Sequence, residues 1–269
     1  ARWCPRTRER RCADPLELMA TTHDMDDTKD GTDETAHDTD NDGENTGSSA
    51  YEAVLFDMDG VILEGRGTDP AVHRRALDDV LTDRGLTVPD DHYDALGSDG
   101  YDEAFRAACA SVGVDAPTLF HEREMRSATR GVARLAAGSR GLYPDVEAID
   151  RLANHTSVGL VSNNYHPTVE FVVDHFRLSA FGVARGRDLG LDGYQRRKPN
   201  PHYLNEALDA LGVSTGLYVG DRETDVLAAE RAGLESVFIR RAHNAAVDLD
   251  VEPTVEIESL DALVSLVTA

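Results

Sequence analysis

Four short apolar segments, each followed within two residues by a polar residue, constrain the fold of this chain more than any other feature. They span residues 53–56, 157–161, 217–219 and 236–239, and apolar runs of this length are typical of buried strands. Helical patterns alternate with these runs, at residues 145–153, 168–175, 202–211 and 224–232. This alternation predicts an α/β fold with a doubly wound, mostly parallel sheet. Such sheets bind ligands beyond the carboxyl ends of their strands, so the polar residues there are the candidate site.

A long helical stretch interrupts this alternation. Residues 70–83, 99–112 and 117–136 all show helical patterns, and no convincing strand lies between them. Most of their apolar positions, such as Val72 and Ala76, fall at helical spacing and are expected in a core. We therefore expect an inserted helical domain at residues 68–138. The core domain would consist of residues 50–67 and 139–269.

The first 49 residues differ in composition from the rest. Residues 21–49 are dominated by Asp, Glu, Thr, Gly, Asn and Ser, which predicts that residues 1–49 are a disordered acidic leader. An acidic interaction tail is the alternative. The arginine-rich opening lacks the apolar stretch of a secretory signal, and the chain has no apolar run of about 18 residues. A soluble, cytoplasmic protein is therefore expected.

Charge and cysteine content exclude several functional classes. Fifty acidic against 27 basic residues give a net charge of −23, which repels nucleic acid and anionic membranes. Three cysteines are too few and too scattered for a disulfide framework or a zinc site, so Cys109 is expected to be a buried thiol. Only Lys29 and Lys198 are lysines. Acid excess with arginine replacing lysine resembles halophilic proteins, whose salt-rich cytosol screens the repulsion, although ordinary acidity is the alternative.

Four carboxylates lie at the ends of two predicted strands. Asp57 and Asp59 follow the first strand, and Asp221 and Asp225 follow the third. In one crevice, each close pair would repel by roughly 4 kcal/mol at about 4 Å, so a cation must lie among them. Oxygen ligands suit Mg²⁺ better than zinc, which prefers nitrogen and sulfur. A turn role for the first pair and an N-cap role for Asp221 are the structural alternatives.

Lys198, Ser162 and Asn163 offer groups that bind phosphate. Lys198 precedes Pro199 in a region that otherwise uses arginine. An ammonium is a compact charge that bridges a carboxylate and a phosphate oxygen, although chance retention is the alternative. Ser162 and Asn163 place a hydroxyl and backbone N–H groups at a strand end, where a phosphate can dock.

Taken in chain order, residues 56–61, 160–163, 198–199 and 220–225 resemble the four motifs of the haloacid-dehalogenase superfamily. The likeness covers about residues 51–269 and is greatest to its phosphoglycolate-phosphatase-like members. It implies a Rossmann-like core in which the helical insert is a type 1 cap, and a Mg²⁺-dependent phosphatase that acts on a small phosphorylated metabolite. The carboxylate at Asp59 argues against the dehalogenase branch, whose halide leaves unprotonated. It also argues against the ion-pumping branch, which has Thr there.

The resemblance also implies a role for each motif residue. Asp57 would attack phosphorus to form an aspartyl-phosphate, while Asp59 protonates the leaving oxygen and then activates water. Phosphoryl oxygens would be held by Ser162, Asn163 and Lys198. The expected Mg²⁺ ligands are Asp57, the backbone carbonyl of Asp59 and Asp221, with Asp225 either a direct ligand or a residue that holds one.

Two other functions stay open at this point. A phosphomutase similar to β-phosphoglucomutase uses the same acid pair, and a non-catalytic binding protein could use the core only as a scaffold. The sequence identifies neither the ester, for which phosphoglycolate is a family-level expectation, nor the oligomeric state, for which a homodimer is considered. Candidate substrate contacts, each more often a solvated surface residue, are Arg66, His73, Arg74, Asn164 and His166.

Overall fold

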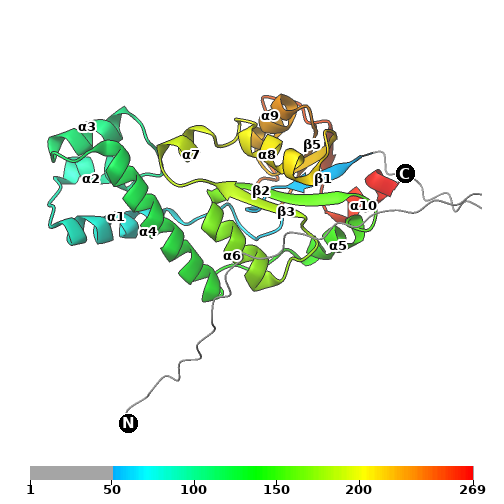
Figure 1. Cartoon of the computed structure of the whole chain (residues 1–269), viewed down its shortest axis with the longest axis horizontal. Helices are drawn as coiled ribbons and strands as arrows, with labels where there is room; N and C mark the ends of the chain where they lie inside the picture. Colours follow the sequence, from blue (N-terminus) through cyan, green and yellow to red (C-terminus); the bar gives the residue numbers. More distant parts are fainter. Residues whose placement is uncertain (1–50, 269) are drawn as a thin grey trace, which may run out of the picture. The chain divides into compact units, whose positions relative to one another are not determined.

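The structure, a computed structural model, describes residues 51–268 (Figure 1). The leader expected at residues 1–49 lies outside this range. Within the described range, no helix combines the length and the apolar character needed to cross a membrane. Cys109 is buried and free, as predicted, and its burial raises the pKa of the thiol to about 11.

Across residues 51–268, six parallel strands form one sheet in the order β3-β2-β1-β4-β5-β6. The strands are β1 (Ala53–Phe56), β2 (Ser157–Tyr165), β3 (Val183–Arg187), β4 (Gly216–Gly220), β5 (Glu235–Ile239) and β6 (Val255–Ile257). The chain order reverses between β1 and β4, and at such a switch point a doubly wound sheet opens a crevice for ligands. The predicted α/β fold class is therefore confirmed.

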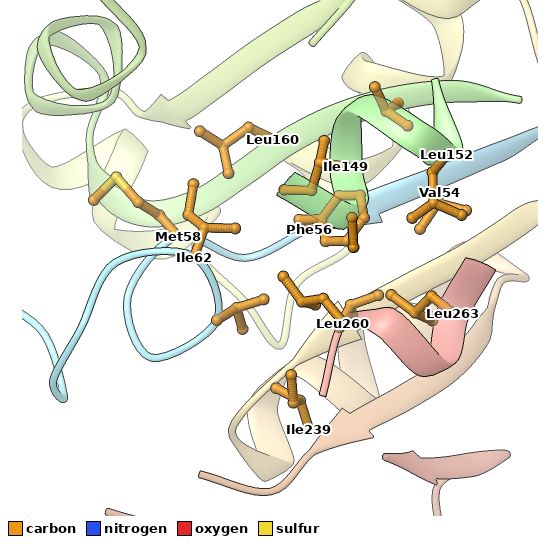
Figure 2. Close-up of a cluster of buried hydrophobic side chains, with 14 of the residues drawn as sticks. Val54, Phe56, Met58, Ile62, Ile149, Leu152, Leu160, Ile239, Leu260 and Leu263 are labelled. Atoms are coloured by element: carbon orange, nitrogen blue, oxygen red, sulfur yellow. The ribbon is translucent and has the colours of Figure 1, made fainter. Parts of the chain in front are cut away.

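Helices cover both faces of the sheet because successive side chains of β1 point to opposite sides. Val54 and Phe56 pack on one face together with Ile149 and Leu263 (Figure 2), whereas Leu55 packs on the other. The helices of the first face are α5 (Ala148–Leu152), α6 (His166–Phe176) and α10 (Asp261–Thr268). Those of the second are α8 (His202–Leu211) and α9 (Glu223–Ala232).

Between β1 and β2 the chain forms a helical segment, residues 70–136, with a hydrophobic core of its own (Figure 1). Phe105 and Phe120 are fully buried in that core. Asp69 caps the first helix by accepting the N–H of Ala71, and Gly85 ends it in the left-handed conformation. The helices are α1 (Pro70–Arg84), α2 (Asp90–Gly97), α3 (Glu103–Ser111) and α4 (Ala116–Ala136).

Several elements differ from the sequence prediction. The strand predicted to end at residue 161 continues to Tyr165, with a register shift after Ser162. Strands β3 and β6 lack an apolar run, because β3 contains two arginines and a glycine and β6 has only three residues. The unpredicted helices are α2, α7 (Leu191–Gln195) and α10, and a 3-10 turn, η1 (Pro144–Glu147), precedes α5.

Candidate active site

The polar residues that follow β1 and β4 meet those of β2 at the carboxyl end of the sheet. Pairing of β1 with β4 fixes the start of this arrangement, since the N–H of Asp57 donates to the carbonyl of Val219 at 2.8 Å. A cavity of about 270 Å³ opens beside Asp57. Of the predicted site residues, those that line it are Asp57, Asp59, Ser162, Asn163, Lys198 and Asp225.

Lys198 lies buried between two carboxylates. Its Nζ is 2.8 Å from Asp57 Oδ1 and 2.7 Å from Asp225 Oδ1, and it contacts the Tyr218 hydroxyl at 2.5 Å. Burial alone would lower the pKa of this ammonium, but Asp225 and Asp57 raise it above its usual value. Lys198 is therefore a fixed cation next to the predicted nucleophile.

Three buried aspartates form a cluster with excess negative charge. Oxygen atoms of Asp57, Asp221 and Asp225 lie within 4.8 Å of one another. Burial, followed by the charges of Asp57 and Asp225, raises the pKa of Asp221 to about 8. Asp221 Oδ1 is buried and has no hydrogen-bond partner within the described residues. The single positive charge of Lys198 does not neutralise three carboxylates. The atoms that the cluster offers to a metal ion are all carboxylate oxygens.

Asp59 lies on the cavity wall and outside the three-aspartate cluster. Arg140 Nη1 contacts its Oδ1 at 2.5 Å, and Asn164 Nδ2 donates to its Oδ2 at 3.0 Å. Its side chain is thus held by two donors at the edge of the cavity, where a carboxyl can exchange a proton with a bound ester or water.

The end of β2 presents donors to the same cavity. Ser162 is buried, and its Oγ accepts the N–H of Asn164 at 3.2 Å. Because Oγ accepts there, its own hydrogen is available to donate. Asn163 pairs with the backbone of Lys198 twice: its Oδ1 accepts the Lys198 N–H at 2.8 Å, and its Nδ2 donates to the Lys198 carbonyl at 3.1 Å. This pairing holds the lysine segment against β2.

The five candidate substrate contacts divide into two groups. Arg66, His73 and Asn164 line the cavity. Arg74 instead lies 3.6 Å from Asp94 at the surface, and the ring of His166 accepts the N–H of Gly186 outside the cavity wall.

Other residues at the site are not indicated by the sequence motifs. Arg140 follows the helical segment and contacts Asp59, and His243 Nε2 lies 2.6 Å from Asp221 Oδ2. Arg187, at the end of β3, lines the cavity. For His243 a signal exists, because it follows the fourth predicted strand within a few residues. Arg140 and Arg187 have no comparable signal.

Comparison with known proteins agrees with this geometry. Residues 51–233 match the model of haloacid dehalogenase-like hydrolases. The chain belongs to this family. The matched range contains every predicted site residue, so the resemblance inferred from the four motifs is confirmed.

Curated relatives of this haloacid dehalogenase-like hydrolase include phosphoglycolate phosphatases. It is 28% identical over 197 residues to a phosphoglycolate phosphatase from Rhodobacter capsulatus, a match that covers 69% of this chain and 83% of the relative. It is 27% identical over 209 residues to one from Yersinia pestis, covering 72% and 83%. Among solved structures, CbbY from Rhodobacter sphaeroides in complex with phosphate has a TM-score of 0.55 at 21% identity and covers 79% of this chain and 96% of CbbY. That structure shares the fold.

Proposed function

We propose that this hydrolase is a Mg²⁺-dependent phosphatase that cleaves small organic phosphate monoesters through an aspartyl-phosphate on Asp57. The observation that carries this proposal is the convergence of a carboxylate, an ammonium and a hydroxyl, those of Asp57, Lys198 and Ser162, on one cavity. The phosphatase activity of the named relatives supports it.

The three-aspartate cluster fits a hard divalent cation. Its ligands would be carboxylate oxygens, which Mg²⁺ prefers, and Oδ1 of Asp221 accepts no hydrogen bond within the described residues, although Arg222 Nε lies 3.6 Å from it. Asp225 is already engaged, because Oδ1 contacts Lys198 and Oδ2 accepts the N–H groups of Asp221 and Arg222. We infer that Asp57, Asp221 and the Asp59 carbonyl hold the ion, and that Asp225 orients Asp221. Bound Mg²⁺ would supply positive charge against the phosphoryl oxygens.

The chain's own side chains would supply the nucleophile, the acid–base group and the hydrogen-bond donors of both half-reactions. A carboxylate oxygen of Asp57 forms a bond to phosphorus while the ester oxygen leaves and takes a proton from Asp59. Lys198 and Ser162 donate to the phosphoryl oxygens, whose charge spreads in the transition state. In the second half-reaction Asp59 accepts a proton from water, which attacks phosphorus, releases inorganic phosphate and regenerates Asp57.

We also propose that residues 68–138 act as a cap that selects the ester. His73 and Asp99 of this region line the same cavity as Asp57. The leaving group therefore contacts side chains from both parts of the protein. Phosphoglycolate is the first substrate to test, since the curated relatives carry that name.

A screen of small phosphate esters with Mg²⁺ in high KCl tests the proposal, with wild type beside Asp57→Asn. Steady release of inorganic phosphate is expected from wild type. The variant should fold but lose at least about a thousandfold in turnover, because it lacks the nucleophile. Little phosphate release together with dependence on a bisphosphate primer would indicate a mutase. Undiminished turnover by Asp57→Asn would refute the mechanism.

A further inference from the structure

A buried ion pair joins the helical segment to the end of the sheet, away from the three-aspartate cluster. Glu124 of α4 has no exposed surface, and its Oε1 lies 2.5 Å from Nη2 of the buried Arg187 at the end of β3. The other oxygen, Oε2, accepts the N–H of Gly190 at 2.6 Å. The Arg187 guanidinium also lies 4.6 Å above the ring of Tyr165. One carboxylate oxygen is thus bound to the last residue of β3 and the other to the segment that follows it.

The same guanidinium reaches the end of β2. Arg187 Nε donates to the backbone carbonyl of Asn163 at 3.1 Å. That carbonyl and the N–H of Asn164 belong to one planar peptide unit and point in opposite directions. Holding the carbonyl therefore fixes the direction of the N–H, which donates to Ser162 Oγ at 3.2 Å.

We propose that Glu124 is a remote positioning residue: through Arg187 and the Asn163–Asn164 peptide it orients the Ser162 hydroxyl that binds the phosphoryl group. This inference rests on the proposed function, because it takes Ser162 as a phosphate donor. Beyond that function, it states that the packing of α4 against the end of β3 affects how tightly the site binds phosphate.

A purely structural role explains the arrangement less well. A buried ion pair contributes little net stability compared with apolar side chains of similar size, because both charges lose their hydration. The guanidinium of Arg187 donates to Glu124, to the Asn163 carbonyl and, at 3.3 Å, to the Asp188 carbonyl. It is therefore placed to set the orientation of a peptide at the site.

The test is the dissociation constant for inorganic phosphate, measured by titration calorimetry with Mg²⁺ present. Glu124→Gln is expected to raise it about tenfold. The matched control is Asp79→Asn, which removes the ion pair between Asp79 of α1 and Arg130 of the same helix α4, away from the cavity. That control should stay within about twofold of wild type.

A double-variant cycle separates positioning from general weakening. If Glu124 acts through Ser162, then Glu124→Gln combined with Ser162→Ala should bind phosphate no more weakly than Ser162→Ala alone. If the double variant instead loses phosphate affinity by the product of the two single-variant factors, the inference is overturned. Wild-type affinity in Glu124→Gln would also overturn it. Failure of wild type itself to bind phosphate or hydrolyse any ester would instead count against the proposed function.

Two further measurements keep the test decisive if Glu124→Gln does not fold. The double variant Glu124→Leu with Arg187→Met removes both charges of the pair and leaves neither one buried without its partner, so it should fold and bind phosphate about tenfold more weakly; wild-type affinity in it would overturn the inference. In the wild-type protein, coupling is reciprocal. Phosphate should slow hydrogen exchange at the Gly190 amide, which donates to Glu124, and an unchanged rate would contradict the coupling.

Discussion

At the scale of single residues, the site is dominated by charges that lie out of water. Lys198 is 3% exposed and Asp225 is 2% exposed, so each depends on the other for compensation. Removing one partner of such a pair leaves the other charge buried and unpaired, which costs far more stability than the pair itself contributes. The same side chains therefore govern both stability and chemistry.

Lys198→Met is expected to destabilise the protein as well as inactivate it. Asp57 and Asp225 lose the cation that both contact, which should lower the free energy of unfolding by about 3–5 kcal/mol. Urea denaturation measures the change. Arg196→Met, at an exposed neighbour, should stay within about 0.5 kcal/mol. Equal effects of the two substitutions would contradict the buried network.

The stability of the metal-free protein should fall as pH rises. The pKa of Asp221 is raised to about 8, while an ordinary aspartate titrates near 3.9. Between these values the unfolded chain holds fewer protons at this group than the folded chain, so rising pH favours unfolding. We expect the free energy of unfolding in EDTA to decrease across this window.

Asp221→Asn is the control for this pH dependence, because an amide does not titrate. The free energy of unfolding of Asp221→Asn should therefore decrease less with rising pH than that of wild type. Adding Mg²⁺ at about pH 8 should stabilise wild type by mass action and Asp221→Asn much less. A wild-type profile that stays level in EDTA, or one identical in the variant, would show that Asp221 does not carry the effect.

At the scale of elements, the backbone of the turn after β1 approaches the end of β4 closely at the site. Gly60 has φ +84°, and a Cβ there would lie 2.2 Å from Asp221 Oδ2. Only a glycine lets the turn that carries Asp57 and Asp59 come this close to the end of β4.

Gly60→Ala should therefore cost more than a change at another left-handed glycine. Gly138 has φ +77°, and no atom lies within 4 Å of the position that a Cβ would take there. Gly138→Ala should therefore lower the free energy of unfolding by only about 1–2 kcal/mol, through backbone strain. Gly60→Ala adds overpacking of about 1–3 kcal/mol and should reduce Mg²⁺ affinity. Thermal unfolding and Mg²⁺ titration check this, and equal costs at the two glycines would disprove the close approach.

At the scale of the whole molecule, net charge should govern stability. With a net charge of −23, the folded chain repels itself. The screening length shortens from about 10 Å at 0.1 M salt to about 3 Å at 1 M. We expect KCl to raise the urea midpoint over this range, and NaCl to do so similarly if screening is the cause. A midpoint that falls with salt would count against the halophilic interpretation.

Much of the fold and of the candidate site can be predicted from local sequence. The strands β1, β4 and β5 each contain a short apolar run, and such a run indicates a buried strand without coordinates. Asp57, Asp59 and Asp221 can be placed because the carboxyl ends of parallel strands share one edge. By contrast, β3 contains the sequence VARGR, which forms a strand only because β2 lies beside it.

The α/β class follows from the amino-acid sequence alone, because it depends on periodicity, and the family follows from the resemblance of four short motifs to those of known proteins. The side chains that complete the site emerge only when the elements are packed together. Arg140 on Asp59, His243 on Asp221 and Glu124 on Arg187 are contacts between residues 22 to 81 positions apart. Their geometry is set by how helices and strands pack, and no local pattern encodes that packing.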